Sequence, residues 1–175
     1  IHTTIETAEM IKYANNAFLA LKISYINELA NLCDEIGADI NEVTEALGSD
    51  GRISPKFLHP GPGFGGSCFP KDTKALIRIA KKHNLDMHTI DAAIKTNNYQ
   101  KLRMFNKLEI LLEGNFNKKK IGILGLAFKQ ETDDVRESAA IDMISGLIKR
   151  GANIKAYDPV ANDSMKKLIP NIDYK

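Results

Sequence analysis

The sequence predicts an all-α region followed by the start of an α/β domain with a parallel sheet. Apolar residues recur at helical spacing over Thr4–Ile36 and again over His88–Leu112, and neither stretch contains glycine or proline. Further along, the pattern changes to short strands that alternate with helices, which is typical of parallel α/β sheets. We therefore expect a helical domain over residues 1–87, a connecting helix and linker over 88–117, and a truncated α/β domain over 118–175.

The first helix is expected to end at Gly37, since glycine commonly takes the left-handed conformation at helix C-termini. Asp39 can cap the helix that follows, with Glu42 at its third position, and that short helix continues through Leu47. From Gly48 through Pro70 the sequence contains six glycines and four prolines, which predict a long irregular loop. Loops of this length inside compact domains tend to be functional.

Pro70 suits the first turn of a helix that runs to about His83, and the long helix His88–Leu112 comes next. After a linker at Gly114–Asn117, the expected elements of the α/β domain are strand Lys120–Gly125, helix Ser138–Arg150, strand Asn153–Tyr157 and helix Ala161–Leu168.

The composition argues against several classes of protein. The formal charge is only +2, with 24 basic and 22 acidic side chains interspersed, so no field suited to nucleic acid or an anionic membrane is expected. No apolar run approaches the roughly 20 residues that span a bilayer, and the opening residues do not form a secretory signal. We therefore expect a cytoplasmic protein. We expect no metal site, because the four histidines lack metal-ligand spacing.

The segment Gly63–Asp72 carries the strongest chemical signal. Its glycines let backbone approach a ligand, and Cys68 falls just before the first turn of a helix, where unpaired N–H groups and the helix dipole favour a thiolate. Asp72 lies one turn later on the same face, and Lys71 adds positive charge. The alternative is a glycine-rich turn with a small buried thiol at a helix cap. Cys33, in the apolar stripe of the first helix, is interpreted as core packing.

Other candidate residues are less specific. Lys12 and Asn16 are four residues apart on the first helix and could together stabilise an oxyanion, or could belong to a solvated stripe. The segment Gly125–Lys129 follows a buried strand but is not the G-x-G-x-x-G fingerprint of dinucleotide sites. Arg136 could meet a phosphate. Tyr157–Pro159 closes a strand at the edge where α/β sheets bind ligands, or forms a simple turn.

Gly63–Asp72 resembles the active-site loop of the UDP-glucose/GDP-mannose dehydrogenase family, in which the cysteine follows G-F-G-G or G-Y-G-G and precedes a Lys-Asp pair. The resemblance extends over nearly the whole chain. It takes in Lys12–Phe18, Arg52-Ile53, Gly125–Lys129, Asp134–Ser138 and Tyr157–Pro159, in the family's order. Several separated motifs are more specific than any one of them.

The resemblance implies oxidation of the C6 alcohol of UDP-glucose to the acid, UDP-glucuronate, with two molecules of NAD. In the family the sugar passes through a thiohemiacetal and a thioester on the cysteine, which assigns Cys68 as nucleophile. It likewise implies that Lys12 and Asn16 stabilise oxyanion character at C6, and that Asp72, with Lys12, activates water for thioester hydrolysis.

Further roles are implied by the same resemblance. The implied substrate-binding residues are Arg52, Phe57, Phe64, Gly65, Phe69, Phe128 and Lys129, and the implied cofactor-binding residues are Lys71 and Arg136. Arg52 resembles an arginine that reaches the substrate of a neighbouring subunit, since the family forms homodimers through its central helical domain. The N-terminal Rossmann domain of the family is absent from this sequence, so we expect no turnover by this chain alone.

Three alternatives stay open. Within the family, the substrate could be GDP-mannose or UDP-N-acetyl-mannosamine. The chain could instead be a dimerisation and nucleotide-binding module without chemistry of its own. A cysteine hydrolase would need a histidine base near Cys68, and His59 is the only candidate nearby in sequence.

Overall fold

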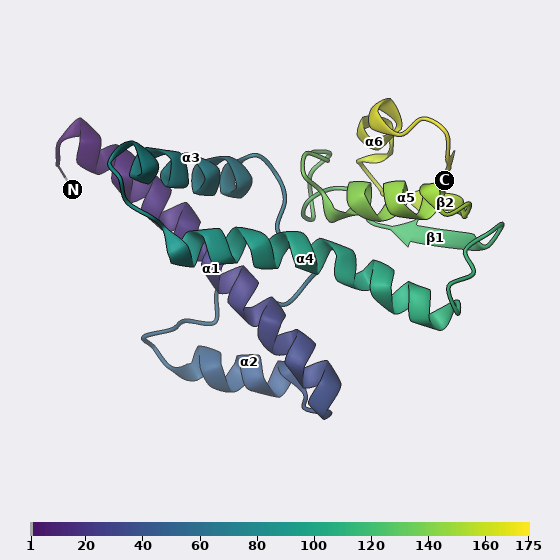
Figure 1. Cartoon of the computed structure of the whole chain (residues 1–175), viewed down its shortest axis with the longest axis horizontal. Helices are drawn as coiled ribbons and strands as arrows, with labels where there is room; N and C mark the ends of the chain where they lie inside the picture. The colour runs from purple at the N-terminus through teal and green to yellow at the C-terminus, as the bar shows by residue number, and fades with distance from the viewer. Residues whose placement is uncertain (1) are drawn as a thin grey trace. The chain divides into compact units, whose positions relative to one another are not determined.

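The structure, a computed structural model, describes residues 2–175. Its helices and strands are α1 (Ile5–Ile36), α2 (Ile40–Ser49), α3 (Cys68–Lys82), α4 (His88–Leu111), β1 (Lys120–Leu124), α5 (Ala139–Lys149), β2 (Asn153–Tyr157), α6 (Asn162–Leu168) and β3 (Asp173–Tyr174) (Figure 1). A helical region followed by a small parallel sheet confirms the predicted fold class.

The chain forms two compact units. The helical unit consists of the chain up to Gly63 together with Cys68–Asn98, and the α/β unit consists of Phe64–Ser67 together with Tyr99–Lys175. The chain therefore passes between the units at the glycine-rich loop and again within α4.

Helix α1 begins and ends where its sequence requires. The Thr4 hydroxyl accepts a hydrogen bond from the Thr7 amide, at 3.3 Å, and Gly37 ends the helix in the left-handed conformation with φ 74°. Inside the helical unit, α1 packs against α3 (Figure 1). A small apolar cluster of Ala17, Leu76 and Ile90 joins α1, α3 and the first part of α4. This packing fixes which face of α1 meets α3.

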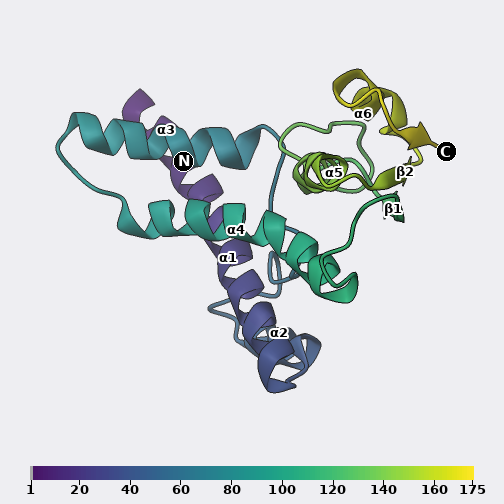
Figure 2. The same ribbon diagram turned by 45° about the vertical axis from the view of Figure 1, so that its right-hand side comes forward.

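Helix α2 lies beside the C-terminal part of α1 (Figure 2). Its cap is Asp39, whose side chain accepts from the Asn41 amide at 2.7 Å. The loop after α2 is tied to α1 by the Lys22 ammonium group, which donates to the carbonyls of Ile53, Ser54 and Lys56 at 2.6–3.2 Å. This lysine gives a loop without regular structure a fixed course.

The α/β unit contains a parallel sheet in the order β1-β2-β3, with Lys120 opposite Asn153 and Lys155 opposite Asp173. Helix α5 packs against the sheet, and the core includes the fully buried side chains of Leu126, Ile144, Leu147 and Met165. Strand β3 is a two-residue element that sequence patterns did not predict.

Several predicted boundaries differ from the structure by one or two residues; for example, α3 begins at Cys68 and α6 begins at Asn162. Two of the differences have local reasons. Strand β1 ends at Leu124 because Gly125 has φ 88°, which breaks the extended backbone. Ser138 is the cap of α5 and not its first residue, since its hydroxyl accepts from the Ala140 amide at 3.2 Å.

Over residues 2–175, no helix combines the length and apolar character needed to cross a bilayer.

Candidate active site

Cys68 is the first residue of α3 and is exposed, and it forms no disulfide. The interpretation of Cys68 as a small buried thiol is therefore wrong. Cys33 is 7% exposed on α1, which confirms its place in the core. At the start of a helix the free backbone N–H groups and the dipole stabilise negative charge, so the location of Cys68 suits a reactive thiol.

Asp72 lies one turn after Cys68 on α3 and is almost fully buried, with 1% of its side chain exposed. The Asn16 amide donates to its Oδ2 atom at 2.5 Å. The Lys71 ammonium group lies 2.9 Å from Oδ1, and the Lys12 ammonium group lies 3.9 Å from Oδ2. Lys12, Asn16, Lys71 and Asp72 are thus brought together by the packing of α1 on α3.

The Asp72 carboxyl group is held as the anion. Burial alone would raise its pKa, but the hydrogen bonds from Lys71 and Asn16 and the charges of Lys71 and Lys12 outweigh burial and lower the pKa below 3.8. The hydrogen bond to Asp72 correspondingly raises the pKa of Lys71. A buried carboxylate with cations on two sides can orient a water molecule or accept a proton.

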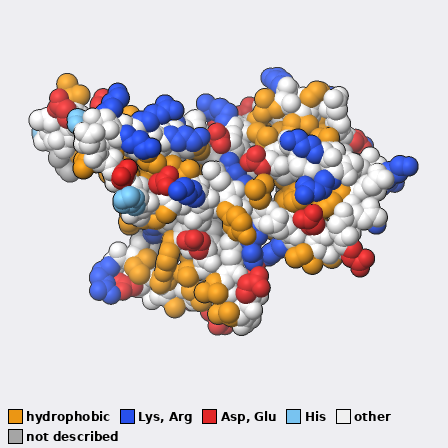
Figure 3. All heavy atoms as spheres, in the orientation of Figure 1, with side chains coloured by type: hydrophobic (Ala, Val, Ile, Leu, Met, Phe, Trp, Pro, Cys, Tyr) orange, Lys and Arg blue, Asp and Glu red, His pale blue; other side chains and the backbone are white. Residues whose placement is uncertain are grey.

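A hollow of about 360 Å³ opens beside this group. It is lined by Ala8, Glu9, Lys12, Tyr13, Lys71 and Asp72. Glu9 and Tyr13 were not predicted as site residues, although Glu9, Lys12 and Tyr13 follow the spacing that places side chains on one helix face. Basic side chains also gather over α3 (Figure 3). The charged side chains that line the hollow are two lysines, Lys12 and Lys71, and two carboxylates, Glu9 and Asp72, so the hollow suits a strongly polar occupant.

Two further predicted residues of the helical unit lie in the loop after α2. Arg52 is 89% exposed and makes a two-pronged ion pair with Asp50, with Nη2 2.5 Å from Oδ2. The Phe57 ring meets the edge of Phe69 with centroids 6.2 Å apart. Because Phe69 directly follows Cys68, this aromatic pair lies at the start of α3.

In the α/β unit, the glycine-rich loop packs tightly against the residues after β1. A Cβ atom on Gly66, which has φ 75°, would lie 2.7 Å from the Phe128 ring. A Cβ atom on Gly65 would meet the Glu137 carbonyl group. The Gly66 amide donates to the Arg136 carbonyl at 2.7 Å, and Phe64 is 7% exposed. These glycines are therefore required by close packing inside the unit.

The remaining predicted residues, Phe128, Lys129 and Arg136, lie in the loop between β1 and α5. The Lys129 ammonium group lies 5.4 Å from the centroid of the Phe128 ring, within cation–π range. The Arg136 side chain pairs with Asp134, with Nη2 2.6 Å from Oδ2. The hydrogen bonds from Arg136 lower the pKa of Asp134, so Asp134 is an anion beside the Arg136 cation. Phe128, Lys129 and Arg136 thus share one loop, although Arg136 is already engaged by a carboxylate.

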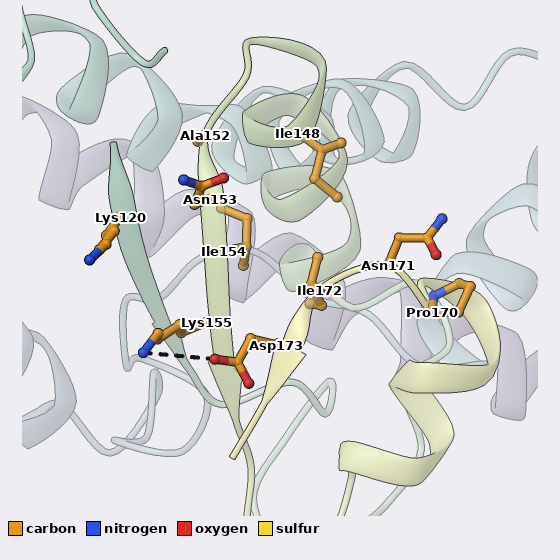
Figure 4. A pocket seen from close by; sticks show the side chains of 10 residues that line it. All are labelled: Lys120, Ile148, Ala152, Asn153, Ile154, Lys155, Pro170, Asn171, Ile172 and Asp173. Atoms are coloured by element: carbon orange, nitrogen blue, oxygen red, sulfur yellow. Dashed lines mark ion pairs between the residues drawn. The ribbon is translucent and has the colours of Figure 1, made fainter. Parts of the chain in front are cut away.

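A hollow of about 600 Å³ lies at the amino ends of the strands (Figure 4). It is lined by Lys120, Ile148, Ala152, Asn153, Ile154, Lys155, Pro170, Asn171, Ile172 and Asp173. No predicted site residue lines it. Parallel α/β sheets bind ligands at the opposite, carboxyl edge, so this hollow is not where a substrate is expected. Over residues 2–175, no cluster of side chains could hold a metal ion.

The fold and site residues match one family over most of the chain. Residues 6–99 match the central domain of the UDP-glucose/GDP-mannose dehydrogenase family, and residues 122–175 match its UDP binding domain. The chain belongs to the UDP-glucose/GDP-mannose dehydrogenase family.

Individual relatives agree with this assignment. UDP-glucose 6-dehydrogenase TuaD of Bacillus subtilis is 52% identical over 161 residues, which cover 92% of this chain and 35% of the relative. UDP-glucose 6-dehydrogenase of Rhizobium meliloti is 45% identical over 173 residues, 99% of this chain and 40% of the relative. A solved UDP-glucose dehydrogenase structure from Pyrobaculum islandicum superposes with a TM-score of 0.93 at 42% identity, covering 97% of this chain and 39% of that one. The chain thus spans 35–40% of the length of the curated relatives.

Proposed function

We propose that this chain supplies the catalytic cysteine and the UDP-binding loops of an NAD-dependent UDP-glucose 6-dehydrogenase. The observation that carries the proposal is the exposed thiol of Cys68 at the first turn of α3, one turn before the ionised Asp72. The names of the relatives support UDP-glucose as the substrate.

In the proposed reaction, UDP-glucose and water become UDP-glucuronate as four electrons leave C6 as two hydrides, and two NAD molecules accept them. The Cys68 thiolate attacks the C6 aldehyde formed by the first oxidation, which creates a C–S bond. The second oxidation turns this thiohemiacetal into a thioester. Water then displaces the Cys68 thiolate, so the C–S bond breaks and the carboxylic acid is released.

The neighbours of Asp72 suit this chemistry. The Lys12 ammonium and Asn16 amide groups are donors that can stabilise negative charge on the C6 oxygen. Asp72, held as the anion by its cations, can accept a proton from the attacking water.

The described residues do not by themselves fit an NAD molecule. The segment Gly125–Lys129 after β1 lacks the G-x-G-x-x-G fingerprint. The Arg136 guanidinium group, expected to approach the cofactor, is paired with Asp134. In residues 2–175, we therefore assign Lys71 and Arg136 at most a peripheral contact with the cofactor.

We also propose that the enzyme is a homodimer through α1. Ile11, Phe18, Tyr25 and Leu32 recur every seven residues on this helix and are 42–60% exposed. Figure 3 shows hydrophobic side chains gathered over α2 and the adjacent end of α1. A heptad-spaced apolar stripe is the pattern that packs against a second helix.

The family also includes GDP-mannose dehydrogenases, so a different nucleotide sugar is the second candidate substrate. The test uses a full-length enzyme that carries this chain, with UDP-glucose, GDP-mannose and UDP-N-acetyl-mannosamine offered in turn. Two NADH per UDP-glucose, with turnover lost in Cys68→Ser and kept in Cys33→Ser, is the expected result. Hydride transfer from another sugar alone would reassign the substrate. The absence of hydride transfer from all three would favour a binding module.

A further inference from the structure

Asp158, directly after β2, accepts hydrogen bonds from backbone amides of two segments, one that follows β1 and one that follows β2. Its Oδ2 atom accepts from the amides of Leu126 and Ala127 at 2.8 and 3.2 Å. Its Oδ1 atom accepts from the amides of Val160 and Ala161, both at 2.9 Å. The side chain is 7% exposed, so these four bonds are largely shielded from water.

The carboxyl group is ionised in this position. Burial raises its pKa, but the four backbone donors together outweigh burial and lower the pKa below the usual value of an aspartate. Hydrogen bonds to a charged acceptor are stronger than those between neutral groups. Asp158 therefore holds the two segments more firmly than an amide side chain of the same shape could.

The four hydrogen bonds show whether Asp158 can bind a ribose hydroxyl or only holds the backbone. An acidic side chain at the end of the second strand of an α/β dinucleotide domain commonly binds a ribose hydroxyl. A carboxylate has about four acceptor positions, and here all four are taken by backbone amides. Asp158 is accordingly unsuited to be a ribose ligand.

Leu126 and Ala127, whose amides bond to Asp158, are the first residues of the loop that carries Phe128 and Lys129. Ala127 precedes Phe128, whose amide donates to the Asp134 carbonyl at 3.0 Å and whose ring lies against Gly66. The Ser138 hydroxyl donates to the Ala127 carbonyl at 3.4 Å. The loop from Leu126 to Ser138 is thus closed on itself, and Asp158 joins its first two residues to the end of β2.

We propose that Asp158 is a positioning residue for nucleotide-sugar binding: through the amides of Leu126 and Ala127 it sets the location of Phe128 and Lys129. This inference rests on the proposed function, which makes those two side chains substrate contacts. Asp158 touches neither substrate nor cofactor, so its loss weakens substrate binding and leaves the chemistry at Cys68 intact.

The test compares Asp158→Asn and Asp158→Glu with the matched control Asp173→Asn, an exposed aspartate on β3 of the same unit. In the full-length enzyme, KM and kcat for UDP-glucose are measured with hydrogen exchange at the Leu126 and Ala127 amides. We expect Asp158→Asn to raise KM at least tenfold, with kcat within threefold, and to speed exchange at both amides. Asp158→Glu, which keeps the charge but moves it, is expected to fall between, and the control to be unchanged.

Two results would overturn the proposal. Unprotected amides with an unchanged KM would make Asp158 a purely structural residue, and a raised KM with unchanged amide exchange would make it a direct ligand. If Asp158→Asn does not fold, Asp158→Glu and the exchange rates of the unaltered protein decide. If no sugar is oxidised, the proposed function fails separately, and calorimetric affinity for UDP replaces KM in the same comparison.

Discussion

Asn16 and Asp72 are 56 positions apart in the sequence, and the Asn16 amide donates a hydrogen bond to the Asp72 carboxylate inside the helical unit. The contact exists because α1 packs against α3. Lys12 and Asn16 lie one turn apart on α1, and Cys68 and Asp72 lie one turn apart on α3. The packing of the two helices brings Lys12 and Asn16 to Asp72.

Asp72→Asn should stop the reaction after the electrons have been removed. If Asp72 activates the water that hydrolyses the thioester, its loss slows steady turnover about 100-fold or more, while a burst of NADH close to two per active site is still formed. Rapid mixing of enzyme with UDP-glucose and NAD measures both. Asp91→Asn, which removes an aspartate paired with Lys95 on α4, serves as the control and should not change either value. Loss of the burst would assign Asp72 to an earlier step.

The contribution of Asp72 to stability should disappear in acid. Its pKa is lowered in the folded protein, so its stabilisation is present above the ordinary value of 3.8 and is lost as the pH falls through the lowered value. The difference in unfolding free energy between the unaltered protein and Asp72→Asn should therefore be constant near neutral pH and shrink below about pH 4. Urea unfolding from pH 3 to 7 measures it. A difference that grew in acid would contradict the assignment of an ionised Asp72.

Gly66→Ala should destabilise the α/β unit by about 2 kcal/mol or more. The added methyl group meets the Phe128 ring, and the backbone at φ 75° disfavours any side chain. Gly61→Ala is the matched control, because no atom lies within 4 Å of its Cβ position, and it should change stability by about 0.5 kcal/mol or less. Thermal unfolding of both variants checks the difference.

A double variant separates the two causes. Replacing Phe128 by Ala in the Gly66→Ala background removes the steric conflict but not the backbone strain. We expect only part of the lost stability to return, relative to Phe128→Ala alone. Full recovery would mean that the left-handed backbone at Gly66 costs nothing.

Phe18→Asp should dissociate the proposed dimer. Phe18 is 60% exposed in the middle of the heptad-spaced stripe of α1, where a charge facing a second copy would be buried without a partner. Sedimentation at micromolar concentration should give the mass of a dimer for the unaltered enzyme and of a monomer for the variant. Leu168, on α6, is 57% exposed, close to the exposure of Phe18, so Leu168→Asp is the control and should leave the dimer intact. Loss of the dimer in both variants would argue against α1 as the interface.

The parts of the fold that depend on local sequence could be predicted. Gly37 ends α1 and Asp39 caps α2 because these effects act within a few residues. The hydrogen bonds from the Leu126 and Ala127 amides to Asp158 could not be predicted in the same way, since they depend on β1 and β2 lying side by side. For the same reason, the binding of the loop carbonyls by Lys22 left no periodic signal.

The site shows the same division. The Cys68 motif and the helical spacing of Lys12 and Asn16 are local, and the structure brings Lys12 and Asn16 to Asp72. The ion pairs of the two arginines could have been found, because Asp50 and Asp134 each precede an arginine by two residues, within reach of its guanidinium group. The edge contact of Phe57 with Phe69 joins residues of a loop and a helix, which no local pattern indicates.

In the proposed reaction, Cys68 carries the sugar as a covalent thioester. Full-length Asp72→Asn enzyme mixed with UDP-glucose and NAD, quenched in acid and digested, allows the adduct to be located by mass spectrometry. We expect the mass of the UDP-glucuronyl group on the peptide that contains Cys68, no added mass on the peptide that contains Cys33, and no adduct in Cys68→Ser. An unmodified Cys68 in enzyme that has formed its burst of NADH would contradict it.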